Sequence, residues 1–80
     1  MRLDKYLKVS RIIKRRTLAK EAVDKGLVLI NGKTAKASSP VKSGDVLTVN
    51  YKDKKEEFEI LEIFEYATEE KAEKMYEKLG

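Results

Sequence analysis

Basic side chains crowd one short stretch of the sequence, between two segments with helical patterns. Arg11, Lys14, Arg15, Arg16 and Lys20 all fall between residues 11 and 20. Phosphate is attracted to such a stretch by the side-chain charges and by the positive end of the helix that follows. Arginine suits this chemistry because its planar guanidinium donates two hydrogen bonds to a phosphate at once. The stretch favours a nucleic-acid contact, although a solvated charged face or a patch for an acidic protein also fits the pattern.

A second set of cations precedes this stretch. Arg2, Lys5 and Lys8 are spaced three residues apart, so they predict a basic ridge along a first helix. The apolar residues between them share another side of that helix and point away from the ridge. Arg2 also lies two residues from Asp4, and a local ion pair between them is the alternative interpretation, which would contribute little to stability if exposed.

Few residues could support catalysis. The chain has no His and no Cys, so the commonest general base, the commonest metal ligand and all thiolate chemistry are missing. Ser10 and Lys14 have the spacing of a nucleophile and its base, but such spacings arise by chance in a Lys-rich chain and no oxyanion site accompanies them. The Glu-rich segment 56–77 lacks the ligand order of a calcium loop. We expect no catalytic residues, no cofactor and no metal site.

Length and charge narrow the class of protein. With 80 residues the chain has room for one small domain. Residues 1–55 carry a net charge of +10 and residues 56–80 a net charge of −6, which indicates a basic surface for a polyanion and an acidic part kept away from it. The apolar run Leu27–Ile30 is far too short to cross a membrane, and no secretion signal opens the chain. We expect a soluble cytoplasmic protein with no membrane partner.

The first 26 residues predict a helical hairpin. Leu3, Tyr6 and Leu7 have helical spacing, and Ser10 offers a break or cap. Thr17 is the expected N-cap of a second helix, and Gly26 stands where a left-handed C-terminal cap belongs. The buried stripe of this second helix is expected to consist of Leu18, Ala19, Ala22 and Val23.

The centre of the chain predicts strands. Residues 27–30 form a β-prone run, Asn31–Gly32 is a strong signal for a tight hairpin turn, and residues 33–36 return as a short strand. A loop over 37–43 leads to a strand over 46–51. A turn over 52–55 then leads to a last strand from Phe58 to Phe64.

The tail predicts a helix. Thr68 can cap it, and an apolar stripe with helical spacing follows. The order helix, helix, strands, helix indicates an α+β fold in one domain. Within this domain we expect residues 1–51 to form the core that binds nucleic acid. Residues 52–80 are expected to form an acidic strand and helix of the same domain. The stripe of the tail helix is expected to consist of Ala72, Met75, Tyr76 and Leu79.

Several blocks together resemble the S4-like RNA-binding domain, over about residues 1–51. The resemblance implies an S4-like fold with an N-terminal helical hairpin packed on a small antiparallel sheet and a C-terminal helix. Features such as Lys5-x-Leu7–Lys8 further resemble the stand-alone S4 proteins of ribosome-associated quality control and their heat-shock relatives, which bind ribosomes. The blocks are Arg2–Leu3–Asp4–Lys5, Arg11 with Lys14–Arg15–Arg16–Thr17–Leu18–Ala19, Gly26-x-Val28-x-Ile30–Asn31–Gly32–Lys33, and Val41–Lys42-x-Gly44–Asp45.

The resemblance implies a non-enzymatic factor that binds the free large ribosomal subunit after a stalled ribosome has split. Its implied partners are large-subunit rRNA, the P-site peptidyl-tRNA and a factor that adds alanine tails to the nascent chain. Asp4 would orient a neighbouring cation without contacting RNA. A general rRNA- or tRNA-binding role and a basic protein-interaction module stay open as alternatives. The RNA-binding residues implied are Arg2, Lys5, Lys8, Arg11, Lys14, Arg15, Arg16, Lys20, Lys33 and Lys36.

Overall fold

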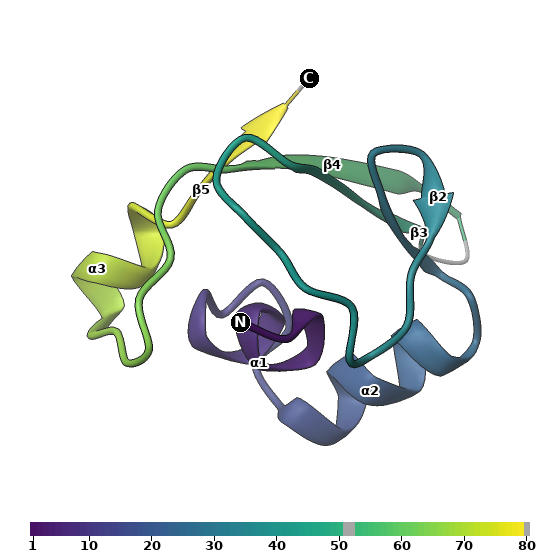
Figure 1. The fold of residues 1–80 in the computed structure, drawn as a ribbon, viewed down its shortest axis with the longest axis horizontal. Coiled ribbons are helices and arrows are strands. Elements are labelled where there is room, and N and C mark those ends of the chain that lie inside the picture. Colours follow the sequence, from purple (N-terminus) through teal and green to yellow (C-terminus); the bar gives the residue numbers. More distant parts are fainter. Residues whose placement is uncertain (51–52, 80) are drawn as a thin grey trace.

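Two short helices lie against one face of an antiparallel sheet (Figure 1). The computed structural model describes residues 1–50 and 53–79. The five strands have the order β2-β1-β3-β4-β5, and every neighbouring pair is antiparallel. The elements are α1 (Leu3–Val9), α2 (Arg16–Asp24), β1 (Val28–Ile30), β2 (Lys33–Thr34), β3 (Val46–Asn50), β4 (Lys55–Ile60), α3 (Glu69–Glu73) and β5 (Tyr76–Leu79).

The predicted first helix and its break at Ser10 are confirmed. Leu3, Tyr6 and Leu7 are fully buried, as their spacing indicated. No side chain caps the start of α1. Instead, the backbone N–H groups of Leu3 and Asp4 donate to carbonyls of the loop 37–39, at 2.8 and 3.2 Å. This loop therefore stabilises the start of α1, where free N–H groups would otherwise need water or a cap.

The second helix begins one residue before the expected cap. Arg15 is the N-cap residue and its side chain makes no capping hydrogen bond, so the prediction of Thr17 as the cap was wrong. Ala19 and Val23, one turn apart, are buried, whereas Leu18 is 50% exposed and does not belong to the buried stripe. One residue step turns a helix by about 100°, so a face centred on Ala19 directs Leu18 away from the core.

Gly26 ends α2 as predicted. Its φ of +76° is left-handed, its N–H bonds the carbonyl of Val23 at 2.9 Å, and the N–H of Leu27 bonds the carbonyl of Ala22 at 3.0 Å. These two bonds define a Schellman motif, which satisfies carbonyls that the helix end leaves free.

The Asn31–Gly32 turn is also confirmed. Both residues have positive φ, +51° and +82°, and Ile30 pairs with Lys33 across the two-residue turn. The Asn31 side chain does more than fit the turn, because its amide donates to the nearly buried Asp45 carboxylate at 3.0 Å and its oxygen accepts from the N–H of Val46 at 2.9 Å. The returning strand β2 ends at Thr34, two residues short of the predicted end.

The two faces of the sheet have different surroundings. Leu47, Val49, Phe58 and Ile60 are buried on the face that packs against the helices. The alternate residues point the other way, and no helix of the described residues covers that outer face (Figure 1). The outer face carries Thr48 on β3, Glu57 and Glu59 on β4, and Glu77 on β5, where the last is the register partner of Glu59.

The C-terminal segment departs from its prediction. The strand expected over 58–64 runs instead over Lys55–Ile60, and the tail helix stops at Glu73. Residues 76–79 form β5, because the free edge of β4 offers hydrogen-bond partners that a helix would leave unused. The predicted Thr68 cap is confirmed, since its hydroxyl accepts from the N–H of Lys71 at 3.3 Å. The predicted strand end at Tyr51, the start of the turn at Lys52 and the final Gly80 lie outside the described residues.

Candidate nucleic-acid interface

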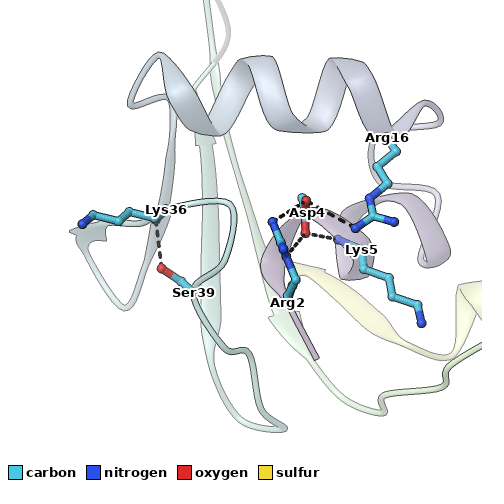
Figure 2. A network of polar contacts seen from close by, with 6 residues as sticks. All are labelled: Arg2, Asp4, Lys5, Arg16, Lys36 and Ser39. Carbon is cyan, nitrogen blue, oxygen red and sulfur yellow. Dashed lines mark hydrogen bonds and ion pairs between the residues drawn. The ribbon is translucent and has the colours of Figure 1, made fainter.

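Two of the predicted RNA-binding residues converge on one buried carboxylate (Figure 2). Asp4 accepts hydrogen bonds from Arg2 Nε at 3.1 Å and Arg2 Nη2 at 3.2 Å, and Arg16 Nη2 lies 3.6 Å from the same carboxylate. The Asp4 side chain is 4% exposed, whereas each arginine side chain is 53% exposed. We call these three residues the Asp4 cluster. It holds two arginines, from the residue before α1 and the first residue of α2, with about half of each side chain open to solvent.

The backbone around the Asp4 cluster restricts how it can move. Arg2 forms an isolated β-bridge with Pro40, and the N–H of Val41 donates to the carbonyl of Met1 at 3.0 Å. Asp4 itself also accepts the N–H of Lys5 at 2.8 Å. With its hydrogen bonds to Arg2 and Lys5 and its low exposure, Asp4 holds both arginines close to itself and offers little surface to a ligand.

The start of α2 adds to this positive surface. Arg15 and Arg16 stand at its first positions, and its first turn contains no acidic residue. Aligned peptide dipoles place partial positive charge at this end of the nine-residue helix, where phosphate is stabilised. Lys20 is exposed one turn further along α2, so it extends the same basic surface.

Three other predicted cations line a groove. Lys8, Arg11 and Lys14 border a hollow of about 560 Å³, together with residues from the segment Tyr66–Tyr76. Arg11 has a φ of +63°, a left-handed conformation that is unfavourable for a residue with a Cβ. This backbone turn exposes the Arg11 side chain directly after α1. We refer to this hollow as the Lys8–Tyr66 groove.

Lys5 has a different environment from the rest of the predicted ridge. Its ammonium group lies 2.5 Å from the Glu65 carboxylate and 5.4 Å from the centroid of the Tyr66 ring. The hydrogen bond from Lys5 lowers the pKa of the Glu65 carboxyl below its ordinary value. Lys5 is half-buried and paired with Glu65. It therefore interrupts the basic ridge that the spacing of Arg2, Lys5 and Lys8 predicted.

Lys33 and Lys36 lie at the hairpin and in the loop that follows it. Both are exposed, and the Lys36 side chain extends away from the Asp4 cluster in Figure 2, while its N–H donates to the Ser39 hydroxyl at 2.9 Å. Nine of the ten predicted residues are thus exposed and Lys5 is half-buried, and among the ten only Arg2 and Arg16 share a common anchor. Their contacts with RNA stay a prediction.

Tyr66 was missed by the sequence analysis. Its ring is 84% exposed at the edge of the Lys8–Tyr66 groove and close to Lys5. A lone aromatic residue in the polar context Glu65–Tyr66–Ala67–Thr68 was the available signal. It could not be interpreted without knowing that residue 66 folds back beside α1.

Within residues 1–50 and 53–79, no group of three or more acidic side chains is arranged to hold a metal ion. No helix in these same ranges is long and apolar enough to span a membrane.

The fold, with a helical hairpin packed on an antiparallel sheet, is that of an S4-type module. The family model described as the S4 domain matches residues 1–47, and the chain belongs to this family. The expected resemblance is therefore confirmed for more than half of the chain.

Individual proteins are similar to this chain over most of its length. A protein of Bacillus subtilis (strain 168), called RQC P-site tRNA stabilizing factor, is 54% identical over alignments covering 100% of this chain and 99% of the relative. A protein of the same name from Helicobacter pylori (strain 26695) is 44% identical, covering 79% of this chain and 75% of its own. Among solved structures, the trimeric Vibrio cholerae Heat Shock Protein 15 superposes with a TM-score of 0.89 at 31% identity, covering 99% of this chain and 81% of that chain. The expected similarity to a heat-shock relative is thus confirmed.

Proposed function

We propose that this protein binds P-site tRNA in ribosome-associated quality control. Relatives whose alignments cover 95–100% of this chain carry the name RQC P-site tRNA stabilizing factor. The Asp4 cluster supports the same conclusion, because two half-exposed guanidinium groups at fixed positions are suited to neighbouring phosphates of a folded RNA. This cluster is the observation that carries the proposal.

Recognition in this proposal depends on RNA shape. The deep major groove of an RNA helix is closed to side chains, so phosphates and 2′-hydroxyls provide most of the contacts. The cations of the Asp4 cluster, the start of α2 and the groove are suited to that task. The protein then acts by binding and positioning RNA, without catalysing a reaction.

We extend the proposal to the setting in which this binding occurs. The protein binds large-subunit rRNA and a peptidyl-tRNA on a large ribosomal subunit that has separated from the small one, in the cytoplasm. It there supports a partner that adds alanine tails to the nascent chain. The support for these details is the similarity in sequence to the stand-alone S4 proteins, with 54% identity to one relative over the whole chain.

Sedimentation with purified large subunits tests the proposal. The subunits are prepared with and without a deacylated tRNA in the P site, and the protein is added as wild type, Arg16→Ala or Lys55→Ala. Each variant loses one positive charge. Arg16 belongs to the Asp4 cluster, whereas Lys55 is an exposed cation of β4 that points to the outer face. We expect tRNA to increase binding of the wild type, Arg16→Ala to reduce binding about tenfold, and Lys55→Ala to change it little.

Two results would refute the proposal. Binding that does not respond to tRNA would remove the P-site assignment and leave only a general rRNA-binding role. Equal losses for Arg16→Ala and Lys55→Ala would mean that total charge matters and the position of the Asp4 cluster does not. As a further check, the logarithm of the affinity should fall steeply with the logarithm of salt concentration, and the slope should decrease by about one unit in Arg16→Ala.

A further inference from the structure

The Lys8–Tyr66 groove has the size and lining of a small binding site. It lies between the end of α1 with the following turn and the segment that contains α3. Its volume of about 560 Å³ lies within the ~300–1,000 Å³ typical of sites for small organic ligands. A single nucleotide is of that scale, whereas a double helix is far too wide to enter.

The groove has two walls of opposite charge. Lys8, Arg11 and Lys14 supply cations from the α1 side, and Glu69 and Glu73 supply carboxylates from the α3 side. A phosphate is attracted to the first wall and repelled from the second. Carboxylates accept hydrogen bonds from the amino groups of nucleobases, so the second wall suits the edge of a base. The walls therefore fix the direction in which a nucleotide would lie.

Tyr66 provides a platform at the edge of this groove. Tyr66 is 84% exposed, so the face of its ring is accessible to a base. The Lys5 ammonium, 5.4 Å from the ring centroid, is itself held by Glu65 and so positions the ring through a cation–π contact. Proteins that bind unpaired RNA use such exposed, positioned rings to stack on the bases.

The backbone of Arg11 supplies an independent observation. Its φ of +63° is a conformation that glycine adopts without cost, yet this position carries a long charged side chain. Strained residues of this kind concentrate at functional sites, because the surrounding structure keeps a side chain in a useful direction. Here that direction is the rim of the groove.

We propose that the Lys8–Tyr66 groove binds one unpaired nucleotide of an RNA. The base stacks on Tyr66, its phosphate contacts Lys8, Arg11 and Lys14, and an amino group of the base donates to Glu69 or Glu73. This inference rests on the proposed RNA-binding function and adds a second contact to the Asp4 cluster. It assigns the two surfaces different tasks, since the cluster contacts backbone phosphates and the groove captures a base that has left its helix.

The test compares two RNA probes. One is a hairpin with an unpaired loop in which a loop adenine is replaced by the fluorescent base 2-aminopurine, and the other is a blunt duplex with the same stem. Binding of each is measured by anisotropy, and stacking by quenching of the 2-aminopurine fluorescence. The variants are Tyr66→Ala, Tyr66→Phe and the matched control Leu61→Ala, which shortens another exposed apolar side chain of the same segment.

We expect Tyr66→Ala to weaken hairpin binding about tenfold and abolish quenching, because stacking on an aromatic ring is worth roughly that factor or more. Tyr66→Phe keeps the ring and should bind within about twofold of wild type, as should Leu61→Ala. None of the three should alter duplex binding. Circular dichroism verifies that each variant is folded, which the exposure of Tyr66 predicts.

The outcomes separate this inference from the proposed function. Equal affinity of wild type for hairpin and duplex, or no effect of Tyr66→Ala on the hairpin, would overturn the groove proposal while tRNA-dependent sedimentation could still hold. If Tyr66→Ala binds both RNAs normally but loses sedimentation with large subunits, the groove contacts a ribosomal protein and the nucleotide proposal is wrong. Failure of the wild type to bind subunits, with hairpin binding and quenching intact, would refute the proposed function alone.

Discussion

Tyr6→Phe removes one hydroxyl from the core and tests how α1 is connected to the C-terminal segment. Tyr6 is fully buried, and its hydroxyl donates a hydrogen bond of 2.7 Å to the carbonyl of Met75, 69 positions away. Phenylalanine keeps the ring and its packing. The substitution therefore isolates a single buried hydrogen bond between distant parts of the chain.

We expect the free energy of unfolding to decrease by about 1 kcal/mol. A buried hydrogen bond contributes about 0.5–1.5 kcal/mol, and a buried carbonyl left with no donor would cost a further ~1–3 kcal/mol. The Met75 carbonyl keeps a donor, because the N–H of Leu61 bonds it at 2.8 Å. The further cost does not arise, and the decrease corresponds to a Tm lower by roughly 4–8 °C in a domain of this size.

The same substitution has a pH dependence with a definite sign. Burial, and to a lesser extent the neighbouring Tyr76, raises the pKa of the Tyr6 hydroxyl above its ordinary value of 10.0. Since the pKa is higher in the folded state, the stability linked to Tyr6 is complete below about pH 10 and is lost as the pH rises further. At about pH 11 ionisation of the unfolded tyrosine costs the wild type roughly 1.4 kcal/mol, which Tyr6→Phe avoids.

Urea denaturation followed by circular dichroism, at about pH 7 and about pH 11, measures both effects. Tyr66→Phe is the matched control, because it removes a hydroxyl from an exposed ring. The deficit of Tyr6→Phe should be present at the lower pH and absent at the higher one. A deficit above about 3 kcal/mol at neutral pH would contradict the role of Leu61, and a deficit unchanged at high pH would contradict the burial of the Tyr6 hydroxyl.

Three further substitutions examine other parts of the structure. Asp4→Ala raises the net charge by one but should weaken binding to large subunits severalfold, because the arginines of the Asp4 cluster lose their anchor; tighter binding in the sedimentation assay would disprove this role. Gly26→Ala should lower the free energy of unfolding by about 1 kcal/mol, since alanine resists a φ of +76° although its Cβ would meet no atom closer than 3.8 Å; an unchanged Tm would argue against the cap. Asp45→Ala should lower the free energy of unfolding by about 1–3 kcal/mol in urea denaturation, because the amide of Asn31 and the N–H of Lys42 lose a buried acceptor. A decrease below about 0.5 kcal/mol, which is the range of ordinary surface substitutions, would mean that water replaces the carboxylate.

Local signals predicted the local structure well. The cap at Gly26, the turn at Asn31–Gly32 and the cap at Thr68 each depend on a few adjacent residues, and each is confirmed. A left-handed φ or a capping hydroxyl is a property of the residue itself, so no knowledge of the remaining chain was needed.

Apart from the Thr17 cap, which was a local signal, the errors concern residues whose structure is decided by distant partners. Tyr76 has helical spacing with Ala72, but it lies in β5 opposite Ile60, with its ring 5.4 Å from that of Phe58. The free edge of β4 and the core beneath it outweigh the spacing in the sequence. The exposure of Leu18 follows in the same way from the face of α2 that the core selects.

The candidate site was likewise predictable in its residue types but not in its long-range contacts. The sequence predicted ten RNA-binding cations, of which nine are exposed and Lys5 is half-buried against Glu65, and their contacts with RNA stay a prediction. It could not indicate that Arg2 and Arg16 meet at one carboxylate, because that contact depends on how α1 packs against α2. Tyr66 reaches Lys5 only through the return of the chain beside α1, a contact between residues 61 positions apart that has no local signature.

The carboxylates on the uncovered face of the sheet have a kinetic consequence. The helices lie on one side of the sheet, while Glu57, Glu59 and Glu77, together with Lys55, point from the other, so the outer face carries a net negative charge. A polyanion repels the negative face and attracts the cations, so its electric field orients the protein before contact with the helices toward the polyanion. Encounters between proteins and their targets are normally slowed to about 10⁵–10⁷ M⁻¹s⁻¹ because most collisions have the wrong orientation, and a steering field raises that rate. For the proposed RNA-binding function, we expect this charge asymmetry to orient the protein on its approach to RNA, and we expect the effect to disappear at high salt.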